Sequence, residues 1–142
     1  GLDRGIVGSA AAAPRGASQL PLNCAPRAPT LAAMSQITDF HAHLYYDPAE
    51  VERAKAVAAE AQKRFGVAVG HFHLAPIGPH PRGSCQLTVP TEMFGDFARW
   101  AVLKRDGLTI FAHASTGDDR ADHHDHVIWF GPSEPLNLAM FG

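Results

Sequence analysis

Apolar and polar positions alternate along residues 37–46, and this period of two predicts a β-strand with two different faces. One face is apolar and carries Phe40, Ala42 and Leu44. The other carries His41, His43 and Tyr45. Because side chains two residues apart on a strand point the same way, the two histidines share a face.

Two helices with apolar stripes are predicted next. Asp47, Pro48 and Glu50 form an N-terminal capping signal, with Asp47 as N-cap. The first stripe follows at helical spacing and ends before Gly66; its members are Val51, Ala54, Ala58, Ala61 and Phe65. The second helix runs from the N-cap Thr91 to residue 105, ends before Gly107, and buries Phe94, Phe97, Ala98 and Ala101.

Three more strands are predicted at residues 67–74, 84–89 and 108–113. Three prolines and two glycines make residues 75–83 an irregular loop, and residues from 114 form an acidic, His-rich loop followed by a short apolar run. The order is strand, helix, strand, strand, helix, strand. It predicts an α+β, ferredoxin-like β-α-β-β-α-β sandwich, an antiparallel sheet with two helices on one face.

This topology suggests where the histidines meet. We expect the first strand between the third and the fourth, parallel to the third and antiparallel to the second and fourth. The start of the first strand and the ends of the second and fourth then share one edge. That edge would collect His41, His43, His73, His80 and His113.

The chain of 142 residues is long enough for one domain, predicted at residues 36–142 after a disordered Ala/Pro-rich tail at residues 1–35. The tail could be a transit peptide, but we favour Met34 as the true start. A net charge of −2 gives no case for nucleic acid or an anionic membrane, and no apolar run reaches the ~20 residues of a membrane span. Cys24 and Cys85 lie far apart in the sequence and indicate neither a disulfide framework nor a zinc site. This fits a reducing compartment, so we expect a cytoplasmic protein.

Histidine is the compositional outlier, with nine residues, all after residue 40. Neutral imidazoles bind iron, zinc, copper or nickel, and three or four of them leave open metal positions for ligands. Single histidines such as His71 and His124 are more often ordinary surface groups. The aspartates of the late acidic loop could supply a carboxylate ligand, orient a ligating histidine, or simply be solvated, and the residues leave this open.

Four stretches together resemble the DOPA 4,5-dioxygenase family, in its small single-domain fungal and bacterial group. They are FHAHLYY at residues 40–46, FHLAPIGPHP at 72–81, HASTGDD at 113–119 and DHHDHVIWFG at 122–131. The resemblance runs from about Ile37 to the end of the chain. At Ala114 the family pattern has proline, a departure that removes no ligand.

The resemblance implies a ferredoxin-like homodimer that opens the ring of a catechol such as DOPA with dioxygen, giving a seco-DOPA-type product. It implies Fe(II), with zinc as a possible occupant, held by some of His41, His43, His80 and His113. His73 or His126 would take the catechol proton. Arg82 and His123 would contact the substrate, Arg82 through a carboxylate.

Two other function classes stay open on the sequence. A non-catalytic ferredoxin-like dimer could bind metal or a small aromatic molecule without turnover. A structural or interaction domain could carry its histidines as incidental surface groups. The number and grouping of the histidines argue against the second alternative, and only the family resemblance separates the enzyme from the binder.

Overall fold

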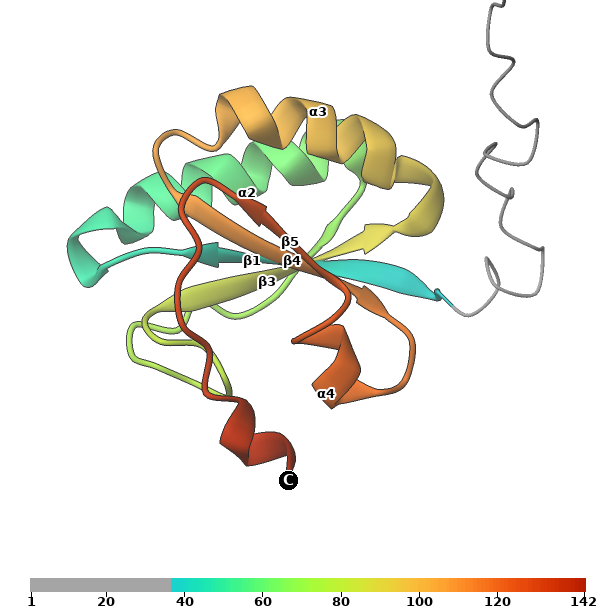
Figure 1. The fold of residues 1–142 in the computed structure, drawn as a ribbon. Coiled ribbons are helices and arrows are strands. Elements are labelled where there is room, and N and C mark those ends of the chain that lie inside the picture. The colour runs from blue at the N-terminus through green and yellow to red at the C-terminus, as the bar shows by residue number, and fades with distance from the viewer. Residues whose placement is uncertain (1–36) are drawn as a thin grey trace, which may run out of the picture.

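A computed structural model describes residues 37–142 of the chain (Figure 1). The predicted tail, with Cys24 and Met34, lies outside these residues. Five strands form one antiparallel sheet in the order β2-β3-β1-β4-β5. The strands are β1 (Asp39–Tyr45), β2 (Ala68–Val69), β3 (Ser84–Pro90), β4 (Thr109–Ser115) and β5 (Val127–Phe130). The helices are α2 (Val51–Phe65), α3 (Phe94–Lys104) and the short α4 (Asp119–Asp122), with 3₁₀ turns η2 (Pro48–Glu50), η3 (Thr91–Met93) and η4 (Leu138–Phe141).

The prediction of an α+β, ferredoxin-like fold is confirmed. Helices α2 and α3 lie together over one face of the sheet, as Figure 1 shows. The core fills the space between them, and its largest members include Tyr46, Phe97, Leu44, Leu87 and Ile110. The opposite face of β1 carries the histidines, as the alternating pattern predicted.

The directions predicted for the second and third strands are both wrong. β1 pairs antiparallel with both neighbours, and Asp39 at its start lies beside Pro90 and Ser115 at the ends of β3 and β4. The crossover through α2 makes β2 run the same way as β1, so the reversal after β2 turns β3 against both. The chain after β2 therefore lies at the Tyr45 end of β1, not at the Asp39 end.

The second strand is shorter than predicted and is broken at a glycine. β2 spans two residues instead of residues 67–74. Gly70 follows at once, and a Cβ there would lie 3.0 Å from the carbonyl oxygen of Gln86. A glycine in a strand pattern often marks such a close backbone approach. His73 returns only as an isolated bridge, with its N–H 2.9 Å from the Ser84 oxygen.

The end of the chain holds a strand that the pattern did not predict. β5 pairs antiparallel with β4, and Phe130 lies beside Ile110. Its four continuous apolar residues carry no period of two, so sequence alone could not tell a strand from another apolar run. The preceding loop contains α4, whose N-cap Asp118 accepts a hydrogen bond from the Ala121 N–H at 3.0 Å.

The helix boundaries follow local chemistry. The Asp47 N–H donates to Glu50 Oε1 at 3.4 Å, which confirms the predicted capping box. Gly66 ends α2 in the left-handed conformation at a φ of 65°. The prediction of Thr91 as N-cap is wrong, since its hydroxyl donates to the Thr38 carbonyl at 3.1 Å and Thr91 itself lies in η3. Within residues 37–142, no helix has both the length and the hydrophobicity needed to cross a bilayer.

Candidate metal centre

The face of the sheet opposite the helices collects five histidines, called here the histidine cluster. His41 and His43 come from β1, and His113 lies directly across from His41 on β4. His80 enters from the Pro-rich loop, where its N–H donates to the Ile77 carbonyl at 3.1 Å. His123 enters from the residue after α4. Residues far apart in the chain therefore meet because β1 and β4 are neighbours and both loops fold back over them.

The ring nitrogens of the cluster lie at distances suited to a metal ion. The Nε2 atoms of His43 and His113 are 3.3 Å apart. Two overlapping sets of three histidines each place one ring nitrogen per residue within 4.8 Å of the others. The sets are His41, His43 and His113, and His43, His80 and His123. His43 belongs to both and is the centre of the cluster.

Contacts at the far side of the rings orient these histidines. His113 Nδ1 lies 2.9 Å from the Ala114 carbonyl oxygen, and His123 Nδ1 lies 2.7 Å from that of Asp119. A carbonyl can only accept, so each Nδ1–H donates and leaves a lone pair on Nε2. His80 Nδ1 lies 2.7 Å from the Tyr45 hydroxyl. In the tautomer that frees His80 Nε2 for a metal, Nδ1 donates to the Tyr45 oxygen.

Burial keeps the inner histidines neutral. Desolvation, reinforced by neighbouring imidazoles, holds the pKa of His43 well below its usual value and lowers that of His80 to about 4. Burial also lowers the pKa of His113 to about 4, although its hydrogen bond to the Ala114 carbonyl opposes the shift. Neutral imidazole is the form that binds metals. Burial raises the pKa of the Tyr45 phenol, so this group stays protonated beside His80.

His41 and His123 are the half-buried members of the cluster. The side chain of His41 is 26% exposed, whereas His43 and His113 are buried. Its Nε2 lies 3.4 Å from Asp39 Oδ1 and 3.3 Å from the Ser115 hydroxyl. The ring of His41 is therefore more accessible to solvent than the rings of His43 and His113.

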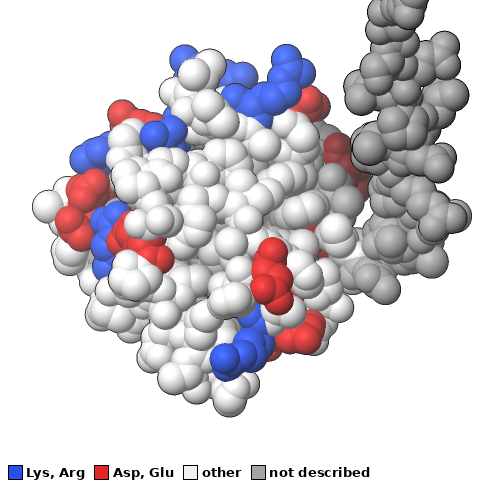
Figure 2. Space-filling view, viewed as in Figure 1, with Lys and Arg blue, Asp and Glu red and all other residues white. Residues whose placement is uncertain are grey.

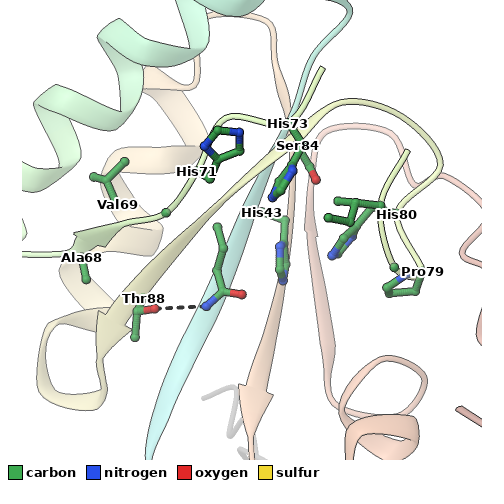
Figure 3. A pocket seen from close by; sticks show the side chains of 13 residues that line it. His43, Ala68, Val69, His71, His73, Pro79, His80, Ser84 and Thr88 are labelled. Carbon is green, nitrogen blue, oxygen red and sulfur yellow. Dashed lines mark hydrogen bonds between the residues drawn. The ribbon is translucent and has the colours of Figure 1, made fainter. Parts of the chain in front are cut away.

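A cavity of about 450 Å³ opens beside the cluster. His43 and His80 form part of its wall, and Figure 3 shows both rings between the Val69 side and the Pro79 side. The thirteen residues that line it include four histidines and the apolar Val69 and Ile77, but no Asp, Glu, Lys or Arg. Three of these histidines come from the segment 71–80. The volume of the cavity lies in the range found for small-molecule sites.

Comparison with known proteins adds a family to this geometry. The model of the Dopa 4,5-dioxygenase family matches residues 40–140. This chain belongs to that family. A DOPA 4,5-dioxygenase from Amanita muscaria is 36% identical over 114 residues, which cover 74% of this chain and 50% of the relative. The chain thus spans about half the length of the curated relative that it matches.

A solved structure agrees with the family membership. The crystal structure of a Nostoc punctiforme protein, described as a candidate dioxygenase, superposes with a TM-score of 0.72 at 36% sequence identity. The match covers 75% of this chain and 93% of that one. The fold on which the histidine cluster is built is therefore shared with a solved protein.

The predicted proton-transfer residues lie in different places in this Dopa 4,5-dioxygenase family member. His73 lines the cavity beside His43 and His80. His126 lines a second cavity of about 740 Å³, formed around α4 and β5. Its Nδ1 lies 2.8 Å from Asp122 Oδ1, and Asp122 also accepts from the Thr116 N–H at 2.8 Å. Burial would raise the pKa of Asp122, but the hydrogen bonds from His126 and Thr116 outweigh it and lower that pKa.

Arg82, predicted to contact the substrate, is occupied by protein carboxylates. Its Nε and Nη2 each lie 2.9 Å from one oxygen of Glu134, and its Nη1 lies 3.3 Å from Asp47 Oδ1. The guanidinium stands 6.0 Å from the centre of the Tyr45 ring and is not part of the cavity wall. Arg82 thus ties the chain after β5 to the start of the first helix.

Three aromatic contacts of the site were not assigned from the sequence. Tyr45 orients His80 through its hydroxyl. The alternation that puts Tyr45 on the same strand face as His41 and His43 could have pointed to this contact. Phe111 packs beside His43 with ring centres 5.8 Å apart, again on a strand position of the right parity. Phe141, in η4, lies 4.7 Å from the ring of His123. No local pattern places that residue, because the contact depends on how the C-terminal segment folds back.

Proposed function

We propose that this protein is an extradiol dioxygenase that opens the ring of a catechol such as DOPA, giving a seco-DOPA-type product. The observation that carries the proposal is the pair of overlapping three-histidine sets, which adjoin a cavity of about 450 Å³ through His43 and His80. Membership of the Dopa 4,5-dioxygenase family supports the same reaction class. The chain matches only half the length of the Amanita muscaria DOPA 4,5-dioxygenase, so DOPA as the substrate of this protein is part of the proposal.

The histidine cluster fits ferrous iron in its donor set. His43 would be a ligand in any arrangement, joined by His113 and His41 or by His80 and His123. Neutral imidazoles without thiolates suit Fe(II), and they also accept zinc. When bound, ferrous iron supplies a centre where catecholate and dioxygen meet. His123, predicted to contact substrate, would be a ligand in the second of these arrangements.

The other residues hold the substrate and its proton. Val69 and Ile77 provide apolar wall for the aromatic ring. His73 lies on the same wall, and its imidazole would accept the proton released from the catechol hydroxyl. His126 faces the second cavity, so we give it the role of holding Asp122, and we assign proton transfer to His73. Arg82 keeps a role in substrate contact only if its pair with Glu134 opens.

Oxygen uptake with L-DOPA tests the proposal. The protein would be reconstituted anaerobically with ferrous iron and compared with His43→Ala and His113→Ala. His124→Ala is the matched control, because His124 is exposed and its ring, within residues 37–142, hydrogen-bonds to the neighbouring Asp125 alone. We expect stoichiometric uptake with a yellow product in the wild type and the control, lost in both cluster variants. Tight metal binding with no uptake from any catechol would contradict the dioxygenase.

The second candidate is a binding module that holds a metal or a small aromatic molecule without turnover. The observation that favours it is the cavity itself, whose four histidines and uncharged walls suffice for binding. It predicts a stable complex of the iron-loaded protein with a catechol, in air, with no loss of oxygen. The same uptake experiment therefore separates the two candidates.

We also propose a homodimer in a reducing compartment such as the cytoplasm. β5 is the last strand of the sheet and exposes Ile128 at 38%. Figure 2 shows Lys and Arg gathered on the helix side, whereas the middle of the face over β5 is largely uncharged. An unpaired strand edge is a natural surface for association. Light scattering of the wild type and of Ile128→Lys tests this; a wild-type monomer would contradict it.

A further inference from the structure

We infer that His71 and His73 form an anion-recognition pair that selects catechols whose ring substituent ends in an acidic group. The inference rests on the proposed function, since it names the substrate class of that same cavity. The two rings lie edge to face with their centres 4.7 Å apart. Both line the cavity that His43 and His80 also line, as Figure 3 shows.

The pair is held in place by backbone contacts. After Gly70 the chain leaves the sheet, and it returns at His73 through two hydrogen bonds with Ser84, of 2.9 and 3.1 Å. The close approach of Gly70 to Gln86 fixes the other side of His71. His71 is exposed and His73 is half-buried. Backbone hydrogen bonds at Gly70 and His73 therefore anchor the segment on both sides of His71, and both imidazoles are accessible to a ligand.

The ring nitrogens of this pair have no protein partner within residues 37–142, and this sets the pair apart. Seven of the nine histidines bond through a ring nitrogen to another group. They are His41, His43, His80, His113, His123, His124 and His126. His71 and His73 are the two that remain. Each neutral imidazole offers one N–H donor, and in His73 the other ring nitrogen stays free to accept the catechol proton. Two unused donors side by side on a cavity wall suit an acceptor such as a carboxylate.

The charge of the cavity points the same way. No Asp or Glu lines it, so an ammonium group on the substrate would find no carboxylate to pair with. None of its lining residues within 37–142 is Lys or Arg either, so the imidazoles are the basic groups of this wall. The hydroxyls of Ser84 and Thr88 and the Gln86 amide do not discriminate by charge, and Gln86 Nε2 already donates to Thr88 Oγ1 at 3.2 Å. Selection of acid over amine thus falls to His71 and His73.

Calorimetry on the zinc-loaded protein, which binds without turnover, tests the inference. The probes are 3,4-dihydroxyphenylacetate, dopamine and 4-methylcatechol, which differ in the charge of the substituent. We expect the acid to bind roughly tenfold or more tightly than the amine, the factor that one charge-assisted hydrogen bond supplies. His71→Leu should remove most of that preference and His71→Glu should reverse it, while His124→Leu should leave it unchanged.

The outcomes separate this inference from the proposed function. Equal binding of acid and amine to the wild type, or a preference that survives His71→Glu, would overturn the anion pair. Oxygen uptake with all three catechols at equal kcat/KM would overturn it too and leave the dioxygenase standing. A clear preference for the acid in the zinc-loaded protein, with no oxygen uptake by the iron-loaded protein, would support the anion pair and contradict the dioxygenase.

Discussion

His43 and His113 face each other across adjacent strands, with their Nε2 atoms 3.3 Å apart. His113 donates its Nδ1–H to the Ala114 carbonyl, so its Nε2 carries a lone pair directed at His43. Without a metal, a proton on His43 Nε2 fills that gap. A metal ion in its place would use both lone pairs, and the His43 proton would move to Nδ1. The pair is therefore arranged to accept either a proton or a cation.

His43→Ala should lose metal binding more completely than any other single variant of the cluster. His43 belongs to both three-histidine sets, whereas His41 and His80 each belong to one. We expect His41→Ala and His80→Ala to retain weakened binding and His43→Ala to retain none at micromolar metal. Metal content after anaerobic loading, with His124→Ala as control, measures this. Stoichiometric metal in His43→Ala would show that His43 is not central.

The metal-free protein should lose stability as the pH falls from about 6.5 toward 4. Burial lowers the pKa of His80 and His113 to about 4, against about 6.5 in the unfolded chain. Between these values the unfolded chain binds more protons than the folded one, so acid favours unfolding. We expect a loss of about 1–3 kcal/mol per buried histidine over this window.

Urea unfolding of the metal-free protein at pH 7.5, 6 and 4.5 measures that slope. His80→Gln should flatten it, because a group that titrates differently in the two states has been removed. His124→Gln should leave the slope unchanged. A stability that is independent of pH over this range would mean that the buried histidines are already protonated or exposed in solution.

Tyr45→Phe should weaken metal binding by roughly tenfold, the lower end of what loss of an orienting partner costs a metal site. The change removes the hydroxyl that lies 2.7 Å from His80 Nδ1 and leaves the ring in place. Tyr46→Phe is the matched control, because the Tyr46 hydroxyl is buried in the core and has no partner within residues 37–142. Equal metal affinity in the two variants would exclude an orienting role for Tyr45.

The sequence predicted which histidines form the cluster better than it predicted the strand directions that bring them together. The alternation from Phe40 to Tyr45 placed His41 and His43 on one face because a strand buried on one side imposes a period of two. The wrong directions of the second and third strands show the limit of such patterns, since period and composition are the same for either direction. His80 still reaches the cluster, because a loop can fold back over the sheet from either edge.

Long-range pairing explains the remaining differences. His123 was predicted to contact substrate, but its place in the cluster depends on α4, a helix of four residues with too little periodicity to predict. No sequence pattern pointed to Glu134, yet its carboxylate accepts two hydrogen bonds from the guanidinium of Arg82. The face on which a strand places its side chains can be predicted from sequence. The partners that a side chain gains when a distant segment folds back over it cannot.

Arg82→Gln should lower stability by about 1–2 kcal/mol, as expected for a bidentate pair that is partly shielded from water. Both side chains of the pair are less than one third exposed, at 28% and 23%. Glu134→Gln should cost about the same, and the double variant little more than either one, because the two residues act through one contact. Urea unfolding of all four proteins gives this cycle directly. If Arg82 instead binds a substrate carboxylate, Arg82→Gln will lower kcat/KM for acidic catechols alone while Glu134→Gln will raise it.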